Sequence, residues 1–171
     1  MIVIGIDPGT ANTGFGVVRT AGDRMVALDG GVIETEADHP VERRLAHLHD
    51  ALGELIRWHE PKAIALEDLF FNRNVGSALS VGQARGVALL AAARHGIPCY
   101  DYTPQAVKKA VCGSGSADKE QIQRMVASLL GLPEPPSPDH AADAFAVAIC
   151  HAGTVASRTA VNAAMRRVAA A

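Results

Sequence analysis

The chain has 171 residues and a formal net charge of −2, and 49% of its residues are hydrophobic. This length suits one domain with a single large core, and the hydrophobic content excludes general disorder. The apolar runs are too short for a membrane-spanning helix, and we expect no secretory signal because the opening residues lack a basic stretch. Three widely spaced cysteines form no paired motif, so we expect a reduced, cytoplasmic compartment.

The hydrophobic pattern predicts an α/β fold. The apolar run at residues 2–6 is typical of a central strand that is buried on both faces. Further strands are predicted at 14–18 and 25–33, with a hairpin turn at Gly22-Asp23 between them. Beyond them we expect helices at about 40–59, 75–94, 104–111, 117–130 and 138–152, and strands at 63–66 and 97–100. These elements predict a mixed five-stranded sheet flanked by helices on both faces.

The charges are unevenly distributed along the chain. Residues 1–69 hold six Lys and Arg against twelve Asp and Glu, whereas residues 70–130 hold seven against three. A basic segment beside an acidic one suits a nuclease, because phosphate contacts then adjoin a carboxylate metal site. A chance distribution of surface charges explains the same counts, so this pattern does not decide the function alone.

Asp7 follows the first predicted strand and shares a strand face with Gly5, which leaves space above the sheet. Ligand sites in α/β sheets gather beyond such strand ends. A carboxylate there needs a cation or hydrogen bonds, and capping of the Pro8-Gly9-Thr10 turn satisfies it equally well. Both interpretations stay open at this point.

Glu67 directly follows the strand predicted at 63–66 and would lie beside Asp7 if the two strands pair. Its neighbour Asp68 points to the opposite face, so only one of them can join Asp7. An ordinary solvated pair of acids at a strand end is the alternative.

The segment SPDHAADAFA provides the third component of a possible site. His140 and Asp143 lie three residues apart on one face of the predicted helix, and Asp139 and Asp143 lie four apart. Either spacing suits a pair of metal ligands, and either is also typical of the polar side of an amphipathic helix.

Two strand-end carboxylates and a helical His/Asp pair form an oxygen-rich set, which suits Mg²⁺ or Mn²⁺ better than structural zinc. Two such ions, about 3.5–4 Å apart, would activate a water and stabilise the leaving 3′-oxygen in phosphodiester hydrolysis. We find no motif that pairs a Ser or Cys nucleophile with a base.

Four segments in this order resemble the RuvC family of bacterial Holliday junction resolvases: IGIDPGTANTGFGV, IALEDLFFNRNVGSALSVGQARG, YTPQAVKKAVCGSGSADKEQ and DHAADAFAVAICHA. The similarity runs from residue 1 to about residue 152. It implies an RNase H-like nuclease domain at residues 1–152. Residues 153–171 would then be an Ala-rich C-terminal tail, either a frayed helix or disordered.

The resemblance also implies an activity. The family acts as a homodimer that makes two symmetric nicks in opposed strands of a four-way DNA junction, using divalent metal, in recombination and repair. RuvA and RuvB, the branch-migration proteins, are the implied protein partners, and no membrane is involved. By this resemblance Asp7, Glu67 and Asp143 are metal-binding catalytic acids. His140 is the fourth ligand, where many members carry Asp, and its softer imidazole favours Mn²⁺; Asp139 is the alternative.

The resemblance implies DNA contacts as well. Phe70 matches the aromatic residue that stacks on a base at the junction, a contact worth roughly 1–3 kcal/mol; burial in the core is the alternative. Lys108 and Lys119 match basic residues that contact the phosphate backbone. Weaker candidates are Arg73, Arg85, Lys109 and Arg124, since most surface Lys and Arg are simply solvated.

A stripe of small residues, Ala78, Gly82 and Gly86, recurs every four positions in the predicted helix at 75–94. The matching helix of the family lies at the dimer interface, although packing onto the chain's own sheet would use small residues too.

Three other classes of protein are alternatives to a junction resolvase. An actin-like sugar kinase needs a second lobe that 171 residues do not hold. A junction-binding module without catalysis and a nuclease that cuts RNA in hybrids are separated by assay, since the fold alone does not fix the function.

Overall fold

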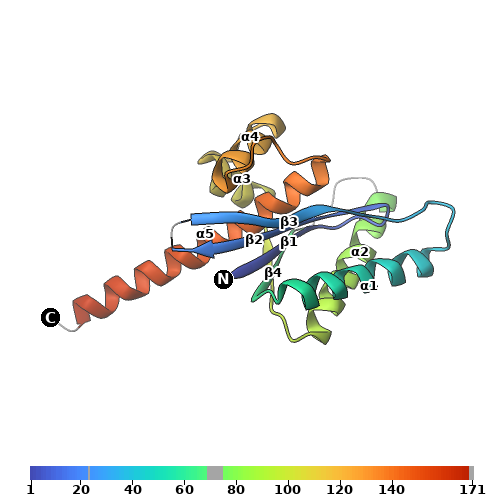
Figure 1. Ribbon diagram of the computed structural model, residues 1–171, viewed down its shortest axis with the longest axis horizontal. Helices are drawn as coiled ribbons and strands as arrows, with labels where there is room; N and C mark the ends of the chain where they lie inside the picture. The colour runs from blue at the N-terminus through green and yellow to red at the C-terminus, as the bar shows by residue number, and fades with distance from the viewer. Residues whose placement is uncertain (23, 69–74, 170–171) are drawn as a thin grey trace.

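The computed structural model describes residues 1–22, 24–68 and 75–169 and contains a mixed five-stranded sheet with the order β3-β2-β1-β4-β5 (Figure 1). The strands are β1 (Ile2–Asp7), β2 (Asn12–Ala21), β3 (Arg24–Glu34), β4 (Ala63–Glu67) and β5 (Cys99–Tyr102). The first three form an antiparallel meander, and β4 and β5 join parallel to β1. The predicted five-stranded sheet is therefore confirmed.

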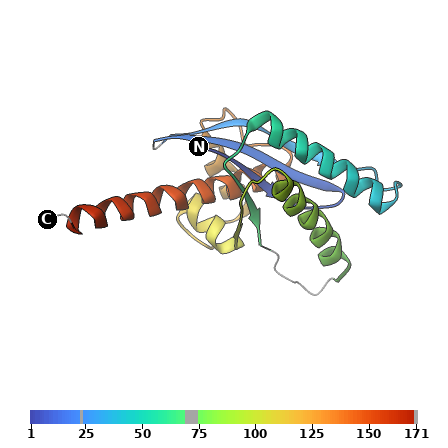
Figure 2. The same cartoon turned by 90° about the horizontal axis from the view of Figure 1, so that it is seen from below.

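Helices cover both faces of this sheet (Figures 1 and 2). They are α1 (Val41–His59), α2 (Val75–Arg94), α3 (Pro104–Cys112), α4 (Lys119–Leu130) and α5 (Asp139–Ala169). Strand alternation assigns side chains to the two layers: Ile4 and Ile6 pack in the core with α1 and α2, whereas Val3 and Ala65 pack in the core with α3, α4 and α5. Among the described helices, none is long and apolar enough to cross a membrane.

Helix α5 lies unusually close to the sheet because glycines form the surface beneath it. A Cβ atom at Gly5 would lie 2.0 Å from the carbonyl oxygen of Ala144, and one at Gly14 would lie 2.0 Å from that of His140. Phe145, which is buried, packs directly over Gly16 and Gly30. A larger residue at Gly5 or Gly14 would push the helix backbone away from the sheet, and one at Gly30 would displace the Phe145 ring.

Several element boundaries differ from the sequence prediction, and β2 is longer at both ends than the predicted 14–18. Strand β5 begins at Cys99 rather than at residue 97, and α5 continues through Gly153 to Ala169 instead of ending at 152. An Ala-rich segment with no proline after residue 138 has the intrinsic propensity to continue a helix. The division into a domain at 1–152 and a tail at 153–171 stays a prediction. Gly22 has the positive φ of +61° that suits a hairpin turn, whereas Asp23 lies outside the described residues.

Candidate active site

Parallel pairing of β1 and β4 brings Asp7 and Glu67 to one edge of the sheet. Their register aligns Ile6 with Leu66, so the next residue of each strand is an acid. Both acids lie on the face that packs against α5, because Val3 and Ala65, at alternating positions of the same strands, belong to that core. The strand pairing that the sequence left open is therefore present.

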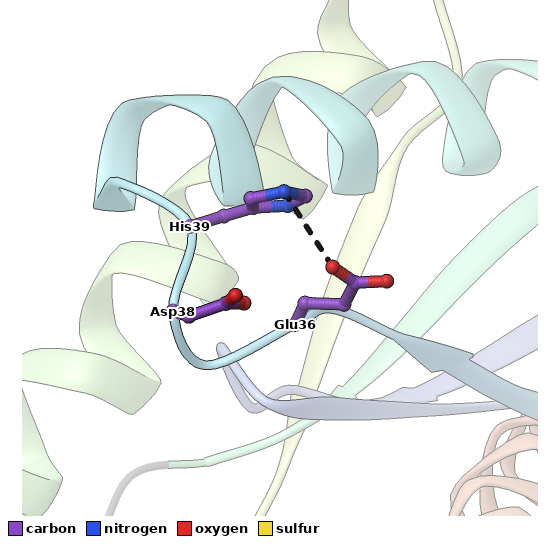
Figure 3. Close-up of side chains that lie close together, drawn as sticks. All are labelled: Glu36, Asp38 and His39. Carbon is purple, nitrogen blue, oxygen red and sulfur yellow. Dashed lines mark ion pairs between the residues drawn. The ribbon is translucent and has the colours of Figure 1, made fainter.

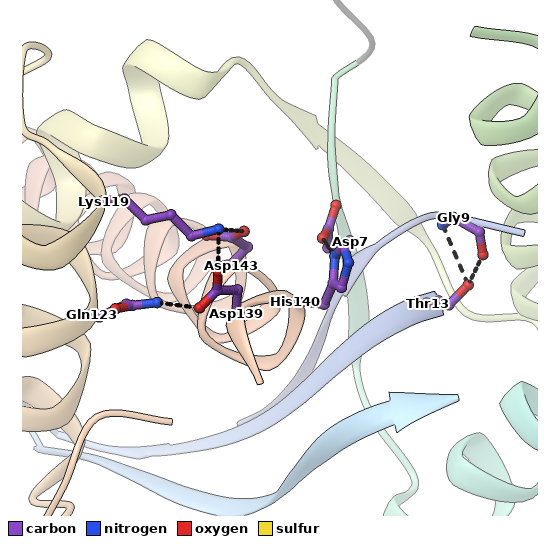
Figure 4. A network of polar contacts seen from close by, with 8 residues as sticks. All are labelled: Asp7, Gly9, Thr13, Lys119, Gln123, Asp139, His140 and Asp143. Atoms are coloured by element: carbon purple, nitrogen blue, oxygen red, sulfur yellow. Dashed lines mark hydrogen bonds and ion pairs between the residues drawn. The ribbon is translucent and has the colours of Figure 1, made fainter. Parts of the chain in front are cut away.

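The first turns of α5 place His140 and Asp143 above these acids. His140 lies over Gly14, which is the β2 partner of Asp7, and its ring Nδ1 hydrogen-bonds Asp7 Oδ2 at 2.7 Å (Figure 4). Asp143 lies one helical turn further along and is one-third exposed. Three elements distant in the sequence thus contribute to one polar site.

The carboxylates repel one another. The pKa of Glu67 is raised to about 7, first by burial and then by the charges of Asp7 and Asp143, while Lys108 lowers it in part. The pKa of Asp143 is also raised, by burial and by Asp7, against the opposing charges of Lys119 and His140. A bound cation would relieve this excess of negative charge, so the site suits a metal ion.

Two lysines border the acids. Lys108 on α3 and Lys119 at the start of α4 line a cavity of about 210 Å³ together with Glu67 and Asp143. The Nζ atom of Lys119 lies 3.9 Å from Asp143 Oδ2 and 2.8 Å from Asp139 Oδ2. The hydrogen bond with Asp139 is the main cause of the raised pKa of Lys119. The two alternative ligands on α5 therefore face different partners, Asp139 facing Lys119 and His140 facing Asp7.

Threonines, rather than Asp7, stabilise the turn after β1. The hydroxyl of Thr13 donates to the carbonyl of Gly9 at 2.6 Å, and the hydroxyl of Thr10 hydrogen-bonds that of Ser80 on α2. The hydrogen bond found for the Asp7 side chain is the one from His140. The interpretation of Asp7 as a turn cap is therefore not supported.

Gln123 is a polar residue of this region that the sequence analysis missed. Its side-chain amide donates to Asp139 Oδ1 at 2.8 Å (Figure 4). The available signal was its position four residues after Lys119, which puts both on one face of α4.

The structure describes some of the predicted DNA-contacting residues and not others. Phe70 and Arg73 lie outside the described residues, so their roles stay predictions. Arg85 donates to the carbonyl of Glu67 at 3.2 Å and pairs with Asp101 at 2.5 Å, so it stabilises the ends of β4 and β5. Arg124 lies 3.9 Å from Glu120, and Lys109 is exposed.

A second acidic group lies on the loop between β3 and α1 (Figure 3). Within the described ranges, Glu36, Asp38 and His39 are the one set of three whose possible ligand atoms all lie within 4.8 Å. All three are exposed, and His39 Nε2 lies 3.5 Å from Glu36 Oε2. Exposed acids on a loop are common without a metal, so we assign no site there.

Comparison with known proteins identifies the family. The sequence profile of the family described as "Crossover junction endodeoxyribonuclease RuvC" matches residues 3–151. The chain belongs to the RuvC family. It is 52% identical over 152 residues to the RuvC of Pelotomaculum thermopropionicum, covering 89% of this chain and 93% of the relative. It is 53% identical over 151 residues to that of Rubrobacter xylanophilus, covering 88% and 84%.

Solved structures agree with this assignment. Thermus thermophilus RuvC in complex with a Holliday junction substrate superposes with a TM-score of 0.89 and 40% identity, covering 93% of this chain and 97% of that one. The yeast mitochondrial Holliday junction resolvase Ydc2 has a TM-score of 0.59 at 16% identity, covering 92% and 85%, and so shares the fold. The RNase H-like fold and the family resemblance predicted from the four segments are confirmed. Membership of this nuclease family implies dependence on a divalent metal ion.

Proposed function

We propose that this chain is a crossover junction endodeoxyribonuclease that resolves Holliday junctions in DNA recombination and repair. It makes paired symmetric nicks in opposed strands by metal-dependent phosphodiester hydrolysis. The observation that carries this proposal is that Asp7 and Glu67 follow paired residues of neighbouring strands, while Glu67 and Asp143 line one cavity with Lys108 and Lys119, in a RuvC-family chain. The Holliday junction complex of the Thermus relative supports the choice of substrate.

We assign Asp7, Glu67, His140 and Asp143 as the ligands of two Mg²⁺ or Mn²⁺ ions. Three carboxylates and an imidazole match the preferences of these ions, and the raised pKa of Glu67 indicates negative charge that a cation would offset. When bound, the metal supplies an activated water and stabilises the leaving oxygen. His140 is favoured over Asp139 as the fourth ligand because it contacts Asp7, whereas Asp139 bonds two residues of α4.

The chain's own residues provide binding and orientation. Lys108 and Lys119 put positive charge at the rim of the cavity, where it attracts the scissile phosphate and partly offsets the acids. His140 donates a hydrogen bond to Asp7 and so fixes the orientation of that carboxylate. Phe70 and Arg73 would add a stacking contact and a phosphate contact on the DNA.

The active unit is a homodimer that pairs through α2, so that two active sites nick two strands. A Cβ atom added at Gly82 or Gly86 would meet nothing within 4 Å, which leaves this side of α2 open to a second helix. Leu79 and Leu90 on the same helix are exposed, as expected of an apolar contact surface. RuvA and RuvB are the proposed branch-migration partners. The three free cysteines agree with a cytoplasmic location.

The test is cleavage of a labelled synthetic four-way junction with Mg²⁺ or Mn²⁺, with linear duplex and RNA–DNA hybrid as controls. We expect paired symmetric nicks in the junction alone. The variant Asp7→Asn should abolish cleavage and preserve junction binding, because binding depends mainly on the basic residues. Cleavage of the RNA–DNA hybrid instead of the junction would show that the chain is a different nuclease with the same fold. Loss of junction binding in Asp7→Asn would show that Asp7 has a structural role.

A second variant tests the basic rim. Lys119→Ala should weaken junction binding and lower the slope of log affinity against log salt by about one. Lys62→Ala, which removes an exposed cation just before β4, at the opposite end of that strand from Glu67, is the matched control and should leave the slope unchanged. An unchanged slope for Lys119→Ala would remove this residue from the interface.

A further inference from the structure

The carboxylate of Asp139 connects the first turns of α4 and α5 (Figure 4). Its Oδ2 atom lies 2.8 Å from Lys119 Nζ, and its Oδ1 atom accepts from Gln123 Nε2 at 2.8 Å. Lys119 and Gln123 lie one helical turn apart on α4, so one carboxylate binds both. Each oxygen of Asp139 therefore has its own partner, which fixes the plane of the carboxylate.

In the structure, this contact places the Lys119 ammonium close to a second carboxylate, that of Asp143. The ammonium is 3.9 Å from Asp143 Oδ2, a distance that is too long for a hydrogen bond but short enough for strong attraction. The Lys119 side chain is 54% exposed and has four rotatable bonds, so without a partner it would occupy many rotamers. Asp139 is the anion nearest to it, and Gln123 orients that anion.

We propose that Asp139, oriented by Gln123, is a positioning residue that holds the Lys119 ammonium beside Asp143 without letting it bind Asp143 directly. The inference rests on the proposed function, because Asp143 is there a metal ligand. A lysine hydrogen-bonded to Asp143 would occupy an oxygen that the metal needs. A lysine free in solvent would have to be reoriented whenever a phosphate enters the cavity, and prior positioning removes that cost.

The same contact has an opposite interpretation that experiment separates. If Asp139 mainly shields Lys119 from DNA, its removal frees a cation and should tighten junction binding without slowing cleavage. If Asp139 positions Lys119, its removal should slow cleavage while junction affinity changes little, because the charge remains on the same flexible side chain. The cleavage rate and the affinity therefore have to be measured separately.

The experiment compares Asp139→Asn with wild type in single-turnover junction cleavage at saturating enzyme, and in junction binding with chelator present. We expect the cleavage rate to fall by roughly 10-fold or more, as for other residues that orient a catalytic group, and the affinity to change little. Glu120→Gln is the matched control, since it removes a carboxylate from the next position of α4 that pairs only loosely with Arg124. Its cleavage rate should equal that of wild type.

Two further variants test the route through Lys119. Gln123→Ala keeps a good helix former and should slow cleavage in the same direction by a smaller factor. Adding Asp139→Asn to Lys119→Ala should cause no loss beyond that of Lys119→Ala alone, because the two residues act as a unit. Thermal unfolding checks that each variant is folded. If Asp139→Asn does not fold, the cleavage rate of Gln123→Ala tests the inference in its place.

A direct readout does not depend on cleavage. The Lys119 amine of the full chain should react faster with an acylating reagent in Asp139→Asn and Gln123→Ala than in wild type or Glu120→Gln, as measured by mass spectrometry. If wild type cleaves no junction, the proposed function fails, and the labelling rates still decide the positioning. Unchanged labelling, an unchanged cleavage rate in Asp139→Asn, or tighter binding with unslowed cleavage would each overturn the inference.

Discussion

The two halves of α5 are both rich in alanine but lie in different environments. Residues 139–152 lie across the sheet, are mostly buried, and carry the candidate ligands His140 and Asp143. Residues 153–169 extend past the sheet (Figure 2), and Val161 and Met165 there are 57% and 66% exposed. Both halves are helical, as their alanine content favours. Helix formation is therefore local, whereas the position of the reactive groups depends on the surface beneath the helix.

That surface is made by residues far from α5 in the sequence. Gly5 lets the backbone of Ala144 approach β1, and Gly14 lets His140 approach the strand next to Asp7. The start of the second half is packed less closely, since a Cβ atom at Gly153 would meet nothing within 4 Å. Changes on the supporting surface should therefore affect the first half of α5 and spare the second.

The largest effect is expected for Gly5→Val. Its Cβ atom would lie 2.0 Å from the oxygen of Ala144 and 2.8 Å from the nitrogen of Ala148, and neither backbone atom can move alone. We expect a loss of about 3 kcal/mol in the free energy of unfolding, which urea denaturation measures. Gly153→Ala is the control in the exposed half and should gain about 0.5–1 kcal/mol. Equal effects of the two changes would contradict the close contact of α5 with the sheet.

The next effect concerns the acid beneath α5. The pKa of Glu67 is about 7 when folded, against an ordinary value of 4.5, so between these values the folded chain holds the proton more tightly than the unfolded chain. Its contribution to stability is fully present below pH 4.5 and is lost as pH rises through 7. Allowing for solvent screening, we expect the free energy of unfolding of the wild type to fall by an amount on the order of 1–2 kcal/mol as pH rises through this range. Glu67→Gln should remove this fall, because glutamine does not titrate.

Urea unfolding between pH 5 and 8 in the presence of chelator measures this decline. Glu36→Gln, a change at an exposed position of the loop after β3, serves as the control and should leave the pH profile unchanged. Parallel profiles for wild type and Glu67→Gln would show that burial by α5 does not perturb this carboxyl group.

The smallest effect is expected from the exposed half of α5. Removing residues 160–171 deletes side chains such as Val161 and Met165, which bury little apolar surface. We expect the melting temperature to change by less than about 2 °C, and junction cleavage to stay within about twofold of wild type. Differential scanning calorimetry and the junction assay check this. A large loss of junction affinity would instead show that this half of the helix contacts DNA.

The sequence by itself determined the elements and the family, and it supplied the candidate residues of the site. Periodicity predicted the five strands and five helices, because side-chain spacing reflects which face of each element is buried. Strand-end positions made Asp7 and Glu67 candidates, and the four ordered segments identified the family that the comparisons confirm. For Phe70 and Arg73 the roles stay predictions.

Only the tertiary structure decided which of these groups meet. The register of β1 with β4 puts Asp7 beside Glu67, and the glycines beneath α5 bring His140 to Asp7. Asp139, the neighbour of His140, turns instead to Lys119. Adjacent residues on a helix point about 100° apart, so their partners depend on how the helix is placed against other elements. That placement depends largely on contacts such as Gly5 with Ala144 and Asp7 with His140, which lie more than a hundred positions apart in the chain and which no local pattern encodes.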